Sequence, residues 1–108
     1  MRRGVRGEVG FILHSKVVYL YIKPLEDVDK KLEEHIDYLN KYYSLGKFIC
    51  SGRRNPRIGG VILCNAETKK EVNQIIQEDP FYINQIAKYE IIEFSPTKYA
   101  NGFEKFIK

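Results

Sequence analysis

The chain has 108 residues, of which 44% are hydrophobic and 30% charged, a composition typical of one small globular domain and not of a disordered protein. No apolar run approaches the roughly 20 residues that a membrane-spanning helix needs. The apolar patch at residues 11–13 is also too short for the core of a signal peptide. We therefore expect a cytoplasmic protein with no membrane partner.

The net charge of +4 is concentrated near the N-terminus. Residues 1–16 contain four basic residues and one acidic residue, so they carry three of the four net positive charges. Because the rest of the chain is nearly neutral, the charge argues against a nucleic-acid-binding surface on the folded domain. Residues 1–16 also lack hydrophobic periodicity. We expect them to form an N-terminal extension that can be mobile, followed by a domain over residues 17–99 and a tail over residues 100–108.

The first half of the domain predicts a strand, a long helix and a hairpin. Residues 17–22 are rich in β-branched and aromatic side chains and indicate a strand with no charge on either face. A helix is expected from Pro24 to Leu45, with its apolar stripe at steps of three and four residues: Leu25, Val28, Leu32, Ile36 and Leu39. Two strands, residues 48–52 and 59–64, flank a turn-rich loop and should pair as an antiparallel hairpin.

The second half predicts a short helix and a last strand. Thr68 with Glu71 three residues later is a capping box, and it opens a helix whose buried side is Val72, Ile75 and Ile76. Asp79-Pro80 ends this helix, and residues 81–87 can form a further turn. Residues 89–94 indicate the fourth strand. In the tail, Phe103, Phe106 and Ile107 can dock as a short helix.

This βαββαβ order predicts an α+β, ferredoxin-like fold, with a four-stranded antiparallel sheet and the helices on one face. We expect Tyr19 and Tyr21 to point to the other face, together with either Val61 and Leu63 or Ile62 and Cys64. A half-exposed antiparallel sheet normally carries polar residues on its wet side, and this one does not. A second copy of the chain is the simplest cover, so a homodimer is expected.

Two residues stand out as candidates for proton transfer. His35 lies on the same helix stripe as Leu32 and Leu39, so it points toward the sheet. A histidine there is either a core residue satisfied by one hydrogen bond or a functional group with a carboxylate beside it. Asp79 is the candidate partner. It also fits an N-cap before Pro80, and the two roles are compatible because a carboxylate has two oxygens.

Candidate ligand-binding residues follow the second strand. Ser51-Gly52 offers a hydroxyl and a close backbone approach, or is simply a strand end. Arg53, Arg54 and Arg57 place three guanidinium groups on one loop, either as solvated surface or as a site for a substrate carboxylate.

Cys50 and Cys64 are the only cysteines. We expect reduced core residues, with a disulfide across the hairpin as the alternative. With no CxxC spacing and two histidines, the chain shows no zinc pattern, and we expect neither a metal nor another cofactor.

The chain resembles the YCII-related (YciI-like) family over residues 17–99. The resemblance is carried, in order, by Glu34-His35-Ile36-Asp37-Tyr38-Leu39, Ser51-Gly52, Gly59-Gly60 and Glu78-Asp79-Pro80-Phe81. It implies a ferredoxin-like fold that dimerises through its sheets, as in the dimeric α+β barrels. It further implies a pocket in which His35 and Asp79 act as an acid–base pair. In the family, Ser51-Gly52 is commonly followed by proline, whereas Arg53 stands here, and residues 1–16 have no counterpart.

Three functions follow from this reading. The first is a small-molecule enzyme, a lyase or isomerase acting on a small anionic enol- or lactone-like compound, with His35 moving a proton and Asp79 fixing its tautomer. In this enzyme Ser51 and the arginines would bind the substrate. The second is a non-catalytic ligand-binding or accessory module that uses the same pocket. The third, RNA binding, is disfavoured because residues 60–64 hold no aromatic side chain on which a base could stack.

Overall fold

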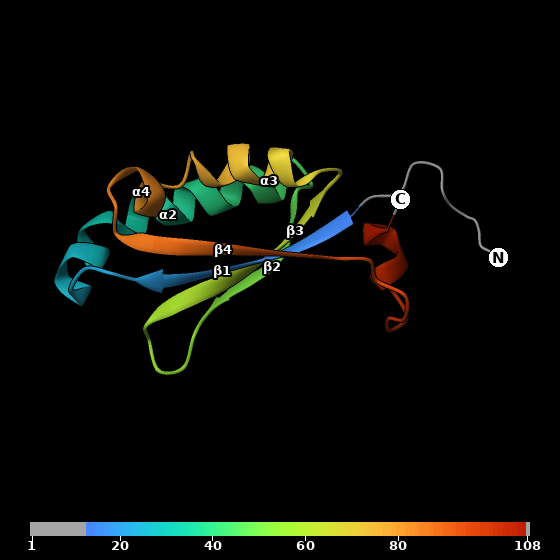
Figure 1. The fold of residues 1–108 in the computed structure, drawn as a ribbon, viewed down its shortest axis with the longest axis horizontal. Coiled ribbons are helices and arrows are strands. Elements are labelled where there is room, and N and C mark those ends of the chain that lie inside the picture. The colour runs from blue at the N-terminus through green and yellow to red at the C-terminus, as the bar shows by residue number, and fades with distance from the viewer. Residues whose placement is uncertain (1–12, 108) are drawn as a thin grey trace.

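The computed structural model describes residues 13–107, which form a four-stranded antiparallel sheet with helices on one face (Figure 1). The elements are β1 (Leu13–Tyr21), α2 (Leu25–Ser44), β2 (Phe48–Arg53), β3 (Gly59–Ala66), α3 (Lys69–Ile76), α4 (Pro80–Ile83), β4 (Ala87–Phe94) and the 3₁₀ turn η1 (Phe103–Phe106). The strands lie in the order β2-β3-β1-β4, and all neighbours are antiparallel. This arrangement confirms the predicted ferredoxin-like α+β fold. No helix among residues 13–107 is long and apolar enough to cross a membrane.

Two strands begin earlier than the sequence pattern predicted. β1 starts at Leu13 instead of Val17, so residues 13–16, expected in the extension, belong to the sheet. β4 starts at Ala87 instead of Tyr89. β1 is a central strand whose backbone pairs with both β3 and β4. These backbone hydrogen bonds keep residues 13–16 in the strand, although the four residues show no apolar alternation. Residues 1–12 lie outside the described part of the chain.

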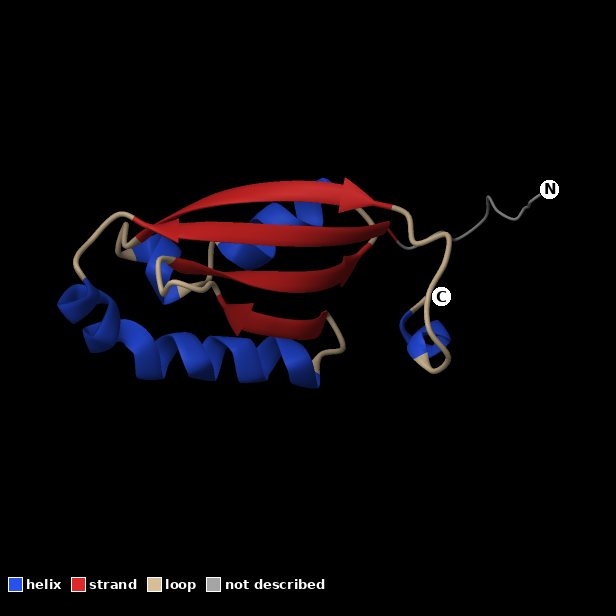
Figure 2. Cartoon of the chain, turned by 90° about the horizontal axis from the view of Figure 1, so that it is seen from below, coloured by secondary structure: helices blue, strands red, loops and turns tan. Residues whose placement is uncertain are grey.

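Helix α2 is one residue shorter at each end than the predicted helix from Pro24 to Leu45, and its buried face is rotated. It ends before Gly46, whose φ of 75° is the left-handed conformation expected just past a helix. Leu25 and Ile36, expected in the buried stripe, are 44% and 46% exposed. The buried residues are Val28, His35, Tyr38 and Tyr42. Because α2 lies along the β2 side of the sheet (Figure 2), its tyrosines pack against Phe48 of β2, a contact that an aliphatic periodicity does not reveal.

The two short helices begin at the predicted caps. The Thr68 hydroxyl accepts a hydrogen bond from the Glu71 N–H at 3.1 Å and opens α3, whose buried residues are the predicted Val72, Ile75 and Ile76. Asp79 accepts one from the Phe81 N–H at 3.0 Å and opens α4. These caps fix where the chain turns back over the sheet, and they place Asp79 beneath α2.

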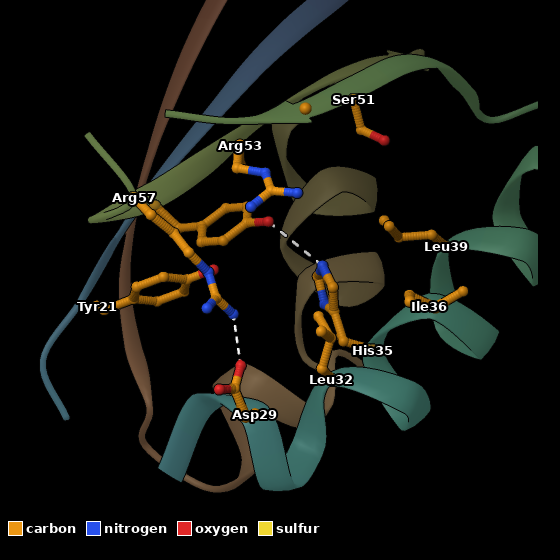
Figure 3. A pocket seen from close by; sticks show the side chains of 11 residues that line it. Tyr21, Asp29, Leu32, His35, Ile36, Leu39, Ser51, Arg53 and Arg57 are labelled. Carbon is orange, nitrogen blue, oxygen red and sulfur yellow. Dashed lines mark hydrogen bonds and ion pairs between the residues drawn. The ribbon is translucent and has the colours of Figure 1, made fainter. Parts of the chain in front are cut away.

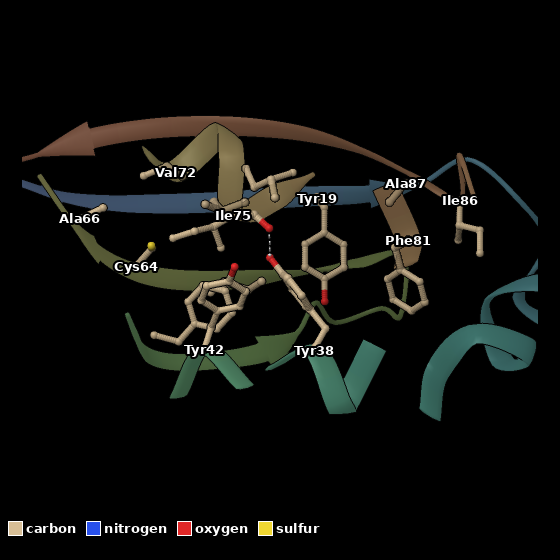
Figure 4. Packing of buried hydrophobic residues seen from close by; sticks show 14 of the residues in the cluster. Tyr19, Tyr38, Tyr42, Cys64, Ala66, Val72, Ile75, Phe81, Ile86 and Ala87 are labelled. Carbon is tan, nitrogen blue, oxygen red and sulfur yellow. Dashed lines mark hydrogen bonds between the residues drawn. The ribbon is translucent and has the colours of Figure 1, made fainter. Parts of the chain in front are cut away.

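The prediction that Tyr19 and Tyr21 face away from the helices was wrong. Val17, Tyr19 and Tyr21 lie on the helix-covered face, and Tyr19 is only 6% exposed within the core (Figure 4). Its partner across the ladder is Gly60, which has no side chain on that face and so leaves room for the phenol ring. Ile62 and Cys64 share this face, so Val61 and Leu63 point to the other one.

Contrary to expectation, the uncovered face also carries charged residues, because Lys16, Lys88 and Glu90 stand beside its apolar side chains. We call its apolar part, formed by Val18, Leu20, Val61, Leu63, Ile92 and Phe94, the open sheet face. Leu20, Ile92 and Phe94 are each 41% exposed. The tail covers one end of the face, because the Phe103 ring lies 5.8 Å from that of His14, and His14 Nε2 is 3.1 Å from the Phe106 carbonyl oxygen. The predicted docking of the tail as a short helix therefore takes the form of η1.

Cys64 lies in the core as predicted, whereas Cys50 is exposed, and both are free thiols. Burial raises the pKa of Cys64 to about 12, so its thiol stays protonated and unreactive at neutral pH. A register shift between Phe48 and Cys50 turns Cys50 to the open side of the sheet. This irregularity explains why the expected core position of Cys50 was wrong.

Candidate functional site

His35 and Asp79 lie side by side in the interior, although they are far apart in the sequence. The distance between His35 Nδ1 and Asp79 Oδ1 is 2.8 Å, and the two residues are 3% and 0% exposed. Helix α2 supplies the histidine from its buried face, and the cap of α4 supplies the carboxylate. A carboxylate can only accept, so Nδ1 carries the proton and Nε2 of the neutral imidazole carries the lone pair.

Asp79 accepts three hydrogen bonds. Oδ1 receives the His35 Nδ1–H and the Phe81 N–H, and Oδ2 receives the Tyr89 hydroxyl at 2.6 Å. Burial first, then the charge of Asp79 and the hydrogen bond to it, raise the pKa of Tyr89, so the phenol remains a donor. The three donors compensate for the removal of a charged group from water.

Aromatic rings fix the orientation of the His35 imidazole. The Phe81 ring stacks on it with centroids 4.1 Å apart and an interplanar angle of 8°. The Tyr19 ring meets it edge-on at 5.8 Å, and the Tyr19 hydroxyl lies 3.3 Å from Nε2. The four polar side chains therefore form one buried chain of contacts, Tyr19–His35–Asp79–Tyr89.

A cavity of about 340 Å³ opens beside this chain, between α2 and the β1–β2 part of the sheet (Figure 3). Its size is at the lower end of the range for small-molecule sites. Tyr19 and His35 are buried residues of its lining, 6% and 3% exposed, and Leu32, Ile36 and Leu39 give one wall an apolar surface. The polar rim is contributed by Asp29, Ser51, Arg53 and Arg57.

The three candidate arginines have different positions. Arg57 forms an ion pair with Asp29 at 2.6 Å across the cavity mouth, and the hydrogen bond to Asp29 raises the pKa of Arg57 (Figure 3). Arg53 extends from β2 into the cavity and forms no ion pair with any residue of the described chain. Arg54 does not line the cavity. Arg53 is therefore the cation whose charge is free for a ligand.

Ser51 and Gly52 also border the cavity. The Ser51 hydroxyl lies 2.7 Å from the hydroxyl of Tyr43 on α2, so the two can orient each other at the rim. If Tyr43 donates, the Ser51 O–H is left to point at a ligand.

Sequence reasoning missed Tyr19, Tyr89, Tyr43 and Asp29. Gly59-Gly60 was the available signal for Tyr19, because a glycine opposite a large ring indicates a close approach. Tyr89 and Asp29 have no local signal, since their partners are distant in the sequence. Among residues 13–107, no group of three or more His, Cys, Asp or Glu side chains lies close enough to hold a metal ion.

The fold and the site together define a small α+β domain with a ligand-sized cavity beside a buried His–Asp pair. The chain belongs to the YCII-related domain family, whose profile matches residues 15–95. The resemblance noted from the sequence motifs is thereby confirmed.

A solved structure shares this fold: 5-chloro-2-hydroxyhydroquinone dehydrochlorinase (TftG) from Burkholderia phenoliruptrix AC1100, in complex with 2,5-dihydroxybenzoquinone. The TM-score is 0.58 and the identity 18%, over 82% of this chain and 95% of the other. At that identity the likeness establishes the fold. No curated protein sequence matches the chain significantly.

Proposed function

We propose that this chain is a small-molecule enzyme of the lyase or isomerase type, which moves a proton on a small anionic enol- or lactone-like substrate. The observation that carries the proposal is the buried 2.8 Å contact between Asp79 and His35, a residue that lines the cavity. Asp79 holds the Nδ1 proton and thereby leaves Nε2 as the basic atom on the cavity side. An imidazole suits proton transfer near neutral pH.

The charges at the cavity support an anionic substrate. Arg57 is neutralised by Asp29, whereas Arg53 keeps an uncompensated guanidinium inside the cavity. A guanidinium binds a carboxylate or an enolate oxygen through two parallel hydrogen bonds. Ser51 can add a further donor from the same strand. A dehydrochlorinase of the same fold, bound to a dihydroxybenzoquinone, is consistent with a planar, acidic ligand.

The experiment is to compare wild type with His35→Ala on a panel of small anionic enols, lactones and chlorinated hydroxyquinones. We expect at least one compound to be converted, and kcat to fall about 100-fold or more without the imidazole. Asn40→Ala is the control, because Asn40 is exposed on the same helix. Turnover that His35→Ala leaves unchanged would remove the proposal.

The alternative, a non-catalytic ligand-binding module, is favoured by one observation. His35 is only 3% exposed, and its Nε2 faces the Tyr19 hydroxyl, so little of the imidazole is open to a ligand. A binding module predicts that ligands raise the melting temperature equally in wild type and His35→Ala. It also predicts that Arg53→Ala abolishes this shift while no compound of the panel is converted.

We also propose that two copies pair through the open sheet face. Leu20, Ile92 and Phe94 would otherwise remain 41% exposed on a face that usually carries polar residues. A two-fold pair is the commonest way to bury such a face, because each copy presents the same surface.

A further inference from the structure

We propose that Tyr19 carries the proton between His35 and a ligand in the cavity, and that its hydroxyl is the atom that contacts the reacting position. This inference rests on the proposed function and assigns a further catalytic residue to it. It also explains how a buried imidazole can act on a ligand that lies in the cavity.

The contacts of His35 offer a route from the imidazole to the cavity. Nδ1 is bound to Asp79, and the Phe81 ring covers one face of the imidazole at a centroid distance of 4.1 Å. Within residues 13–107, the polar contact of Nε2 is the Tyr19 hydroxyl at 3.3 Å. Tyr19 and His35 both line the cavity. A proton that leaves the ligand can therefore reach Nε2 by way of the Tyr19 oxygen.

The sequence provides a dedicated space for the Tyr19 phenol. A methyl group added at Gly60 would lie 2.3 Å from the Tyr19 hydroxyl oxygen and 2.5 Å from its ring carbon Cζ. Gly60 is the cross-strand partner of Tyr19, so the missing side chain admits the phenol over β3. The ring is also stacked on Tyr89 with centroids 5.4 Å apart. The hydroxyl is thus held beside Nε2 by packing from two neighbouring strands.

The transfer balances as follows. The ligand gives its acidic proton to the Tyr19 oxygen while the hydroxyl proton of Tyr19 passes to His35 Nε2, and the electron pair of the broken bond stays on the ligand. Tyr19 ends neutral, and the new imidazolium lies 2.8 Å from the Asp79 carboxylate. Burial, with smaller contributions from Tyr21 and Asp79, raises the pKa of Tyr19, so the two transfers must be coupled and no free tyrosinate accumulates. The reverse sequence returns the proton to another atom of the ligand.

The first test is kinetic, on any compound that the panel shows to be converted. We expect Tyr19→Phe to lower kcat about 100-fold or more while KM changes little, because the ring and its packing remain. Tyr99→Phe is the control, since Tyr99 is exposed and remote from the cavity. Loss of turnover in His35→Ala but kcat within about twofold of wild type in Tyr19→Phe would overturn this inference and leave the proposed function intact.

The second test needs no turnover and uses 2,5-dihydroxybenzoquinone as an acidic enol probe. We expect the probe to shift the ¹⁵N resonance of His35 Nε2 in wild type and to leave it unchanged in Tyr19→Phe. Gly60→Ala, which displaces the phenol but keeps its hydroxyl, should behave like Tyr19→Phe. Equal shifts in wild type and Tyr19→Phe would mean that the ligand meets His35 directly. No shift in wild type would mean that no ligand proton reaches Nε2, and either result would overturn the inference.

Discussion

At the scale of single residues, Asp79 has both a structural role as a helix cap and a place in the candidate site. The same carboxylate caps α4 through Phe81, orients His35 and accepts the Tyr89 hydroxyl. A buried carboxylate is stable only when such donors replace water, so the cap of α4 helps to hold Asp79 in the site. The local sequence signal, aspartate before proline, reports the first of these contacts alone.

We expect Asp79→Asn to lower the free energy of unfolding by about 2–4 kcal/mol, as measured by urea denaturation. Asparagine is an equally good N-cap, so the bond from Phe81 is kept. The loss comes from the charge-assisted bonds to His35 and Tyr89, which an amide group cannot both accept.

Asp29→Asn is the matched control, because Asp29 also forms an ion pair but its side chain is 55% exposed. The Asp29→Asn substitution should lower the free energy of unfolding by less than about 1 kcal/mol. Equal costs at the two positions would contradict the structural role given to Asp79.

At the scale of elements, an ion pair ties the start of β2 to the first turn of α3. Lys47 Nζ lies 2.6 Å from Glu71 Oε2, while Glu71 Oε1 accepts the Glu67 N–H at 3.2 Å. The Lys47 hydrogen bond is the largest of the causes that lower the pKa of Glu71 from its ordinary value of 4.5. This contact helps to fix α3 over the sheet, and α3 leads directly into Asp79.

We expect Glu71→Gln to lower the free energy of unfolding by about 0.5–1 kcal/mol at neutral pH and to leave it almost unchanged at pH 3. A carboxylate whose pKa is lower in the folded state contributes stability that is complete above its unfolded pKa. That contribution disappears as the pH falls through the folded value. Thermal denaturation between pH 7 and pH 3 measures the difference. Glu34→Gln, a more exposed change on α2, should show no such trend, and a cost at Glu71 that does not vary with pH would refute the ionic explanation.

At the scale of the whole molecule, the two faces of the sheet have different covers. The helices bury one face, including Tyr19, Ile62 and Cys64, and η1 covers only one end of the other. On the rest of that side, the apolar residues of the open sheet face stand beside the charged residues Lys16, Lys88 and Glu90 of β1 and β4. Such an arrangement suits an interface between identical copies.

We expect sedimentation or light scattering to give twice the chain mass of 12.7 kDa for the wild type. Val61→Glu, which places a charge opposite Val18 in the middle of the open sheet face, should shift the protein to monomers. Ile83→Glu is the control, since Ile83 is 62% exposed on α4, away from that face. A monomeric wild type at micromolar concentration would rule out the pairing.

The sequence alone determined the elements and their order, because these depend on contacts between near neighbours. The spacing of apolar residues predicted α2, Thr68 with Glu71 and Asp79 with Pro80 predicted the two caps, and the turn-rich loop predicted the hairpin. The βαββαβ order then left few topologies to choose from. His35 and Asp79 could be named as candidates for the same reason, since each has a recognisable local position.

Only the tertiary structure decided which face of β1 meets the helices and which side chains share the cavity. Alternation shows that Tyr19 and Tyr21 lie on one face, but both faces of the strand are apolar, so the pattern could not orient them. The orientation of β1 depends on Gly60, which leaves room for the Tyr19 ring on the helix-covered face. The site depends on Tyr89, on Arg53 and on the ion pair between Arg57 and Asp29. These contacts join segments far apart in the chain, and their energies come from packing and charge in three dimensions, which no local pattern records.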